Sequence, residues 1–412
     1  MKNTVLKVTT ATILASSLLV ASGWRIPEQS SRSTALSGAY VSNASGADSS
    51  YYNPANMSFN ENALLFEGDF TYINLPKLDY TGTVAGIPAN GSSQTEQFFV
   101  PTIFLSSKDY SGFRYGLSIT APGGLSKRWE TPFQKAYAQE FTLEIIEFNP
   151  VVSYALSPKF SIGGGLRAIY SHGVVKSDAS GIGTNVQRDL EGDTIEFGYN
   201  LALSYRPTKE LKFALTYRSN VDLNEEGNSK LYLNGTKVYD GGASVSIPLP
   251  AVLAFAASYT FNGKTTVEFE FDRTYWSEYK DLDFNYKSPI PVILVPSFDD
   301  PIAKNWKDSN AYRIGVTHQY SDKLKFLAGF AIDKTPIPST SLGFELPSSD
   351  AKLYSVGFEY KYSDKMTFGM GYLYDSKDDR TISAADANIQ HMVGEFTNIS
   401  AHLLTLSLKY RF

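Results

Sequence analysis

Few residues in this 412-residue sequence have the types and spacing that catalysis or metal binding requires. None of the histidines lies beside a nucleophile motif or forms a metal-ligand pair at helical spacing: His172, His318, His391 and His402. The acidic stretch "DSKDDRTISAAD", which starts at Asp375, lacks the central Gly and final Glu of a calcium loop. Cysteine is absent, which excludes disulfides and thiolate metal sites. The sequence therefore predicts no enzyme, no metal site and no cofactor.

Three arginines are better candidates, and the chemistry that they offer is the binding of an anion. Arg167, Arg218 and Arg313 fall on the polar side of segments in which polar and apolar residues alternate. A carboxylate in a low-dielectric interior needs such a cationic partner. Each arginine has a second interpretation, as the structural partner of a Glu or Asp on the same face. His172 and Lys176 are weaker candidates for the same role.

The elements that must position these side chains are β-strands. From Glu61 to Phe412, apolar or aromatic residues recur at every second position for about ten residues at a time, and turns follow. In "LLTLSLKYRF", at the end of the chain, Leu404, Leu406 and Leu408 share one face, and Thr405 and Ser407 lie on the other. The composition agrees, because it includes 27 Tyr, 26 Phe and 31 Gly.

The connections between these strands alternate in length. Six are tight and contain turn residues followed by Lys: 107–108, 157–159, 207–209, 262–264, 321–323 and 363–365. Seven are longer and polar: 76–96, 123–140, 177–189, 225–241, 287–305, 336–350 and 377–397. Thirteen connections predict about fourteen strands with both ends on the short-turn side, which is the layout of an outer-membrane β-barrel.

Strands of a soluble β-sandwich also alternate between polar and apolar residues. The beginning of the chain distinguishes a membrane barrel from such a sandwich. Lys2 and Lys7 precede an apolar stretch from Ala11 to Ala21, and small residues follow. This pattern predicts a signal peptide over residues 1–22, because the stretch is shorter than the roughly 20 residues of a membrane-spanning helix. The formal net charge of −5 does not suggest a nucleic-acid partner. We therefore expect an all-β transmembrane antiparallel barrel in the outer membrane of a Gram-negative cell.

In such a barrel the polar faces of the strands line the lumen. We expect most of the lumenal charges to pair across it, the basic set being Arg167, Arg206, Lys212, Arg218 and Arg313 and the acidic set Glu196, Glu268, Glu270, Asp272 and Glu359.

Several stretches, in this order, resemble the FadL family of outer-membrane transporters for long-chain fatty acids and other hydrophobic compounds. They are "GWRIPEQS", "SGAYVSNASGADSSYYNPANM", "LTYRSNVDL", "IPLPAVLAFAASY" with "WSEY", "NWKDSNAYRIGV" and "GFAIDKTPIP". The resemblance implies that residues 23–60 form a hatch inside a barrel of residues 61–412, and that Asn53, Pro54 and Ala55 are the hatch signature. It also implies binding in an extracellular groove, then in a lumenal pocket, followed by passive release.

Pro122, Gly123 and Gly124 interrupt the third predicted strand, where proline and glycine weaken strand pairing. The resemblance implies that a kink here makes a lateral opening in the wall. The alternative is that these residues only begin the loop that follows.

Aromatic residues recur every four positions within "RWETPFQKAYAQEF", namely Trp129, Phe133, Tyr137 and Phe141. Helical spacing places them on one face, either as a wall of the extracellular groove or packed against the rim of the barrel. Trp24 matches a family aromatic that inserts into the lumenal pocket, where it acts either as a displaceable stopper or as an anchor of the hatch.

We therefore predict passive uptake of long-chain fatty acids, with an aromatic-hydrocarbon transporter of the same family or a general porin as alternatives. The predicted partners are a hydrophobic small molecule (a fatty acid, detergent or aromatic hydrocarbon) and outer-membrane lipid. We expect the protein to be a monomer.

Overall fold

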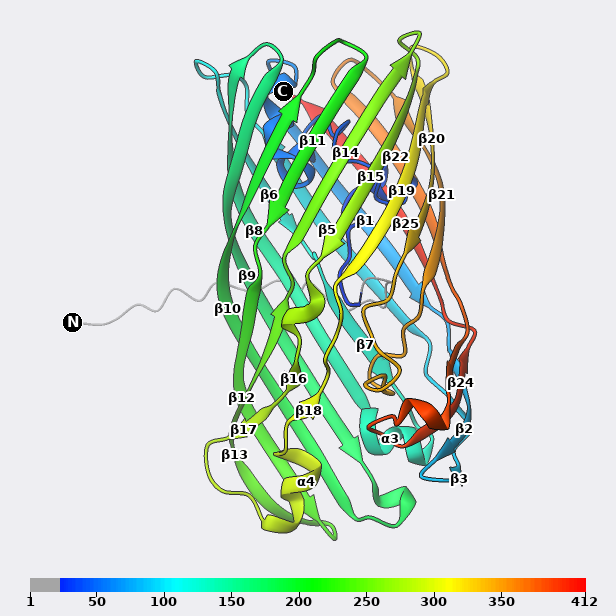
Figure 1. Cartoon of the computed structure of the whole chain (residues 1–412). Coiled ribbons are helices and arrows are strands. Elements are labelled where there is room, and N and C mark those ends of the chain that lie inside the picture. The colour runs from blue at the N-terminus through cyan, green and yellow to red at the C-terminus, as the bar shows by residue number, and fades with distance from the viewer. Residues whose placement is uncertain (1–22) are drawn as a thin grey trace, which may run out of the picture.

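The structure is a computed structural model that describes residues 23–412, and it is a β-barrel with a segment folded inside it (Figure 1). The wall is an antiparallel sheet of 14 strands. The predicted signal peptide lies outside the described residues. Within the described part of the chain, no helix has the length and apolar character needed to cross a membrane.

Ten of the wall strands are continuous segments: β1 (Leu65–Leu75), β5 (Glu96–Ser106), β8 (Glu140–Ser157), β9 (Phe160–Asp178), β10 (Val186–Tyr205), β19 (Ser309–Gln319), β20 (Leu324–Asp333), β21 (Ala351–Lys361), β22 (Met366–Lys377) and β25 (Ser400–Arg411). Four are broken into two pieces each: β6 (Phe113–Thr120) with β7 (Gly124–Arg128), β11 (Leu211–Arg218) with β12 (Val221–Leu233), β13 (Thr236–Leu249) with β14 (Val252–Phe261), and β15 (Thr265–Thr274) with β17 (Phe284–Tyr286).

The remaining elements belong to the long connections and to residues 23–60, an N-terminal segment that we call the hatch. The hatch contains α1 (Ser31–Ala35), α2 (Ser49–Tyr52) and η1 (Pro54–Phe59). The connections contain β2 (Asp79–Val84), β3 (Ile87–Pro88), β4 (Gly91–Ser92), α3 (Pro132–Ala138), η2 (Ser180–Ile182), η3 (Trp276–Glu278), β16 (Asp281–Leu282), η4 (Val292–Leu294), α4 (Val295–Phe298), β18 (Ile302–Ala303), β23 (Arg380–Ile382), η5 (Ala384–Asp386) and β24 (Met392–Thr397).

The first and last wall strands pair and close the barrel. β1 pairs with β25 over ten positions, from Leu65 opposite Arg411 to Asn74 opposite His402. Closure leaves the sheet without a free edge at this seam, as backbone in hydrocarbon requires. The predicted alternation is confirmed in β25, where Leu406 and Leu408 are exposed on the outer surface and Thr405 and Ser407 are buried.

The predicted alternation of short and long connections is confirmed except at 225–241, and Figure 1 shows the short turns at the end of the barrel where the chain terminates. The predicted long loop at 225–241 is wrong. β12 and β13 continue as a hairpin whose turn is Asn234-Gly235, and both residues have positive φ, 50° and 74°. The sequence here predicts a loop because polar residues lie on both faces of the hairpin, so that no continuous apolar face indicates a strand.

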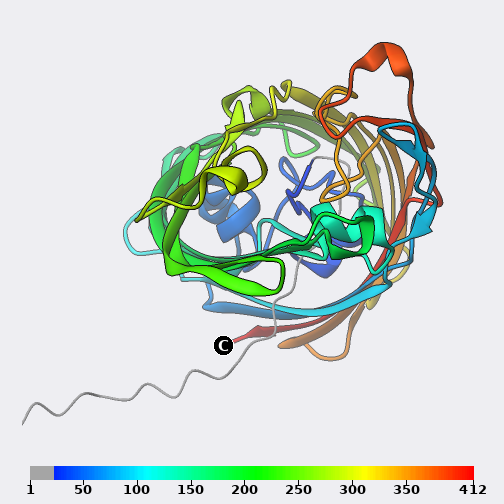
Figure 2. The ribbon, with the colours of Figure 1, turned by 90° about the horizontal axis from the view of Figure 1, so that it is seen from below.

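The hatch, residues 23–60, lies within the ring of strands, as Figure 2 shows for the blue segment. It contacts the wall so closely that side chains are excluded at some wall positions. A Cβ on Gly163 of β9 would lie 2.6 Å from the backbone nitrogen of Ala55. The carbonyl oxygen of Ala55 accepts hydrogen bonds from wall hydroxyls, of Ser161 at 2.7 Å and Ser153 at 3.2 Å.

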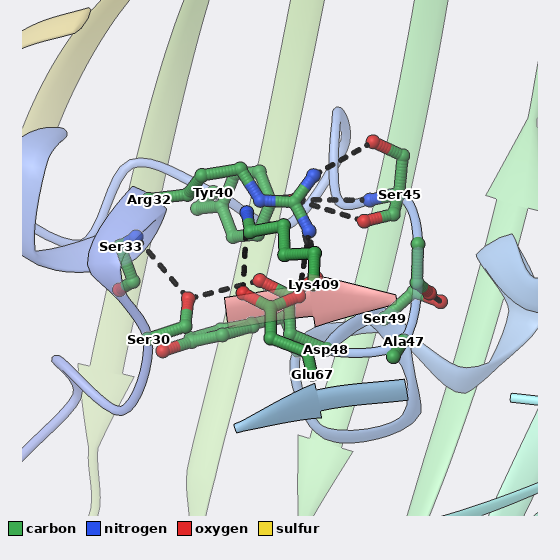
Figure 3. A network of polar contacts seen from close by, with 12 residues as sticks. Ser30, Arg32, Ser33, Tyr40, Ser45, Ala47, Asp48, Ser49, Glu67 and Lys409 are labelled. Carbon is green, nitrogen blue, oxygen red and sulfur yellow. Dashed lines mark hydrogen bonds and ion pairs between the residues drawn. The ribbon is translucent and has the colours of Figure 1, made fainter. Parts of the chain in front are cut away.

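A buried ion network fixes the hatch to the wall (Figure 3). Arg32 of α1 pairs with Asp48 of the hatch at 2.6 Å and with Glu67 of β1 at 3.1 Å. Lys409 of β25 pairs with the same Glu67 at 3.1 Å and also with Glu359 of β21. Because these charges are shielded from water, removing one member would leave its partners buried without compensation.

The expectation that most lumenal charges pair with one another holds for only part of the set. Arg167, Arg218, Arg313, Asp272 and Glu359 form ion pairs. Glu268 and Glu270 instead accept hydrogen bonds from backbone N–H groups of the hatch, at residues 40–43. Lys212 donates to Asn43 of the hatch, and Arg206 donates to Asn56. The reason is that the hatch fills the space across which these side chains would have paired.

The contact between Gly163 and Ala55 gives a first prediction. Gly163→Ala is expected to push η1 away from the wall, because the new methyl group would overlap the Ala55 backbone. The measurement is ion conductance of the purified protein in a planar bilayer, and the expected result is a higher ligand-free conductance than that of the unmodified protein. Gly68→Ala is the matched control, since its Cβ meets only the Phe66 ring, at 3.3 Å. Equal conductance of all three proteins would contradict the tight seating of the hatch.

Candidate functional site

One stretch of the described wall has a strand partner on one side only. β5 pairs with β1 along its whole length, from Glu96 to Ser106. On its other side it pairs with β6 only through residues 103–106. In the part of the chain that the structure describes, no strand pairing joins residues 96–102 to β7. Pro101, which has no backbone N–H, lies in this unpaired stretch, where proline is tolerated.

The break in the third wall strand faces this stretch. β6 ends at Thr120 and β7 begins at Gly124, and both pieces pair with β8. Pro122 and Gly123 therefore lie within the wall strand, between two paired pieces, and Gly124 is the first residue of β7. At the outer end of the unpaired stretch, the Glu96 carboxylate accepts hydrogen bonds from Ser126 at 2.9 Å and Arg128 at 2.5 Å.

The beginning of the hatch pairs with the break from inside the barrel. The Ile26 N–H donates to the Pro122 carbonyl at 2.8 Å, and the Gly124 N–H donates to the Trp24 carbonyl at 2.8 Å. Arg25 and Gly123 form an isolated antiparallel bridge. Hatch backbone thus supplies partners that a regular wall strand would have supplied.

Trp24, the residue before Arg25 of this bridge, is buried in an aromatic cluster. Its ring centroid lies 4.5 Å from that of Trp276, 5.0 Å from that of Trp306 and 5.2 Å from that of Tyr279. These three partners come from the connection between β15 and β19. The indole N–H groups of all three tryptophans are buried and have no hydrogen-bond acceptor among the described residues.

Trp24 also lines an inner pocket, which has a volume of about 20 Å³. The pocket is lined by Trp24, Leu125, Phe141, Leu143, Ile247, Tyr279, Lys304, Trp306, Ile337, Ser341, Gly343, Glu345 and Leu346. Beyond it lies an outer groove of about 580 Å³, between α3, α4, the ends of β9 and β10 with their connection (177–188), and residues 389–391. Phe141, Lys304 and Glu345 line both spaces and so form the partition between them.

Lys304 and Glu345 form a buried ion pair in this partition, with 2.6 Å between Nζ and Oε1. Gln390 donates to the other oxygen of Glu345 at 2.9 Å. Burial alone would raise the pKa of Glu345, but the Lys304 ammonium and its hydrogen bond hold that pKa below its ordinary value. The partition thus holds a fixed cation beside an apolar pocket.

The four aromatic residues Trp129, Phe133, Tyr137 and Phe141 do not lie on one helix. Only residues 132–138 are helical, as α3, and Tyr137 and Phe141 line the outer groove. Trp129 is buried and donates from Nε1 to the Phe344 carbonyl at 2.9 Å. Phe133 packs against the main apolar cluster. Trp129 and Phe141 belong to this same cluster and Tyr137 also packs against it, so all four residues pack the connection onto the barrel and two of them also line the outer groove.

The three arginines lie away from both cavities and have partners. Arg167 pairs with Glu147 at 2.8 Å, and Arg218 pairs with the other oxygen of Glu147 and stacks on Tyr51 of the hatch. Arg313 contacts Asp272 and Asp333. Their geometry fits structural ion pairing, because none lines the inner pocket or the outer groove within the described residues.

The Asn53-Pro54-Ala55 stretch forms the start of η1. The Asn53 side chain accepts from the Ala55 N–H at 3.1 Å and donates to the Val41 carbonyl at 3.2 Å. Proline occupies the first position of the helix, where its missing N–H is not needed. The stretch therefore folds the hatch back on itself where it meets β8 and β9.

The sequence interpretation missed Lys304, Glu345, Trp276, Trp306 and the anchoring role of the Trp24 carbonyl. All four side chains lie in long connections, where polar and apolar residues do not alternate, so the sequence does not indicate which way a side chain points. A signal was present for the aromatic residues, since "WSEY" and "NWKD" place three of them in two short motifs.

Comparison with known proteins agrees with this geometry. Residues 12–412 match the family described as outer membrane protein transport protein (OMPP1/FadL/TodX). The chain is 22% identical over 325 residues to the long-chain fatty acid transport protein of Escherichia coli O6:H1, covering 69% of this chain and 71% of that protein. It is 22% identical over 376 residues to outer membrane protein P1 of Haemophilus influenzae, covering 79% and 80%.

Solved structures share the fold. A FadL homologue from Pseudomonas aeruginosa superposes with a TM-score of 0.84 at 17% identity, covering 95% of this chain and all (100%) of that one. The toluene transporter TbuX of Ralstonia pickettii superposes with a TM-score of 0.71 at 16% identity, covering 93% and 98%. With a family match over nearly the whole chain, this protein belongs to the OMPP1/FadL/TodX family of non-enzymatic outer-membrane proteins, which transport hydrophobic compounds across the outer membrane.

Proposed function

We propose that this protein takes up long-chain fatty acids by passive transport. The observation that carries the proposal is the position of Lys304 in the partition between the outer groove and the inner pocket. A fatty acid has an apolar chain and one carboxylate, and the partition offers an apolar pocket with a cation at its mouth. The ligand carboxylate would replace Glu345 as the partner of the Lys304 ammonium, so that the cation stays paired. The displaced Glu345 carboxylate would keep the hydrogen bond from Gln390.

The hatch then determines how the ligand proceeds. The inner pocket, with about 20 Å³ left free, accommodates an acyl chain only if Trp24 moves. Trp24 therefore acts as a stopper, and its displacement withdraws the backbone partners of Pro122 and Gly124. Release follows sideways between β5 and the β6–β7 break, where strand pairing is missing. Residues 23–60 serve as the hatch and residues 61–412 as the barrel, and no step uses a nucleotide or a metal.

An aromatic hydrocarbon is the second candidate ligand. The three aromatic rings around Trp24 favour it, since a flat apolar molecule could stack among them. It has no charge, so it would gain nothing from Lys304. The names of structural relatives include toluene transporters. A general porin is disfavoured because the hatch occupies the lumen.

The Lys304–Glu345 pair gives a prediction that separates the two ligands. In the double variant Lys304→Met/Glu345→Gln no charge is left buried alone, and oleate binding is expected to weaken about tenfold because a charge-assisted hydrogen bond is lost. Toluene uptake should stay unchanged. The measurements are oleate titration of the purified protein and uptake of labelled oleate and labelled toluene by cells.

The control is Lys352→Met/Asp378→Asn, which removes an exposed pair of similar length, 3.0 Å. It should bind oleate as the unmodified protein does. If the Lys304 double variant also binds and transports oleate normally, Lys304 is not the carboxylate partner. If it loses toluene uptake as well, the partition serves both ligands and the preference for fatty acid is wrong.

The break in the third strand gives another prediction. Replacing Pro122-Gly123-Gly124 with Val-Ala-Val is expected to extend strand pairing and to abolish oleate uptake, while the outer groove still binds oleate. Retained binding shows that the variant is folded. Uptake at the unmodified rate would remove lateral release from the proposal.

A further inference from the structure

Ala121 lies in the break between β6 and β7, and both of its backbone hydrogen-bonding groups are held by one side chain of the hatch. The Gln29 side chain donates from Nε2 to the Ala121 carbonyl at 2.8 Å. The Ala121 N–H donates to Oε1 of the same side chain at 2.9 Å. Gln29 is 2% exposed, so water does not compete for these bonds. The amide thus makes the two bonds that a residue of a neighbouring antiparallel strand would make.

Gln29 is also bonded to the other side of the unpaired stretch. The Thr102 hydroxyl, at the last unpaired position of β5, donates to the Gln29 carbonyl at 2.7 Å. Inside the hatch, the Gln29 N–H donates to the Tyr52 hydroxyl at 2.7 Å, and Nε2 also donates to the Ile26 carbonyl at 2.9 Å. One hatch residue therefore joins β5, the break and the hatch core.

We infer that Gln29 is the latch of the wall break, a positioning residue that keeps Ala121 paired while the hatch is seated and releases it when the hatch moves. This inference rests on the proposed function, in which the hatch shifts during transport. A displaced hatch withdraws the side-chain amide, and Ala121 then has an unpaired donor and an unpaired acceptor in an apolar wall. The break and the hatch consequently open together and not independently.

The coupling is measurable without any ligand. Gly163→Ala disturbs the hatch at Ala55, whereas the latch acts at Ala121, so the two substitutions perturb separate contacts. With Gln29 present, Gly163→Ala is expected to speed hydrogen exchange of the Ala121 amide about tenfold, since the seated state is less populated. In the Gln29→Met background, whose side chain has similar length and no amide, Gly163→Ala should leave that rate nearly unchanged.

The double-variant cycle separates a latch from a residue that merely stabilises the hatch. Hydrogen exchange by mass spectrometry on peptides covering residues 116–128 and 31–36 reports the break and α1, respectively. A stabilising role alone would give the same acceleration by Gly163→Ala in both backgrounds, and that result would overturn the inference. Thr102→Val should weaken the coupling partly, whereas Thr260→Val, which removes a hydroxyl bonded to Thr266 between β14 and β15, should not change it.

Ligand affinity gives an independent readout. If the hydrogen bonds between Gln29 and Ala121 oppose ligand binding, Gln29→Met should bind oleate more tightly, by about fivefold. The reason is that displacing the hatch from the break then costs less free energy. Unchanged or weaker binding in a variant that retains its fold would contradict the latch. If the unmodified protein binds neither oleate nor toluene, the proposed function fails, and the exchange cycle alone then decides whether Gln29 couples the hatch to the break.

Discussion

Backbone groups in a membrane wall must be hydrogen-bonded within the protein. At the break in the third wall strand, this barrel depends on its own N-terminal segment for those bonds. Residues 96–102 of β5 have no strand partner toward β7 among the described residues. The hatch supplies bonds to the break that faces this stretch, through the carbonyl of Trp24, the N–H of Ile26 and the side chain of Gln29. It also contacts β5, whose Thr102 hydroxyl donates to the Gln29 carbonyl. The wall and the hatch are therefore one hydrogen-bonded unit, and moving the second exposes the first.

The hatch is seated by two kinds of contact with different consequences. Toward the short-turn end, a buried ion network around Arg32 and close glycine contacts such as Gly163 with Ala55 hold it firmly. Toward the long connections, Trp24 sits among aromatic rings without using its indole N–H. An apolar ligand can replace ring contacts more easily than it can replace buried ion pairs. This asymmetry favours a local shift of the first hatch residues over loss of the whole hatch.

The barrel was predictable from the sequence because lipid imposes a strict period of two on the outer face, as in β25, and because short and long connections alternate. The site was predictable only in part. Pro122 and Gly123 were identified since few residues disturb a strand so strongly, and Trp24 and Asn53 followed from the family resemblance. Lys304 and Glu345 were not found, because connections fold back over the lumen without periodicity. The three arginines were inward-facing as expected, but alternation could not show that Glu147 and Asp272 already pair with them.

A reversible tether between the hatch and the break tests the central claim that hatch movement opens the route through the wall. Arg25 and Gly123 form an antiparallel bridge, in which Cα atoms lie about 4.5–5.5 Å apart, a distance that a disulfide spans. The chain has no cysteine of its own, so Arg25→Cys/Gly123→Cys gives a single defined cross-link. We predict that oxidised cells lose uptake of labelled oleate and regain it on reduction, while Ala202→Cys/Thr216→Cys, within the wall, has no effect in either state. Uptake that continues with the hatch tethered to the break would contradict it.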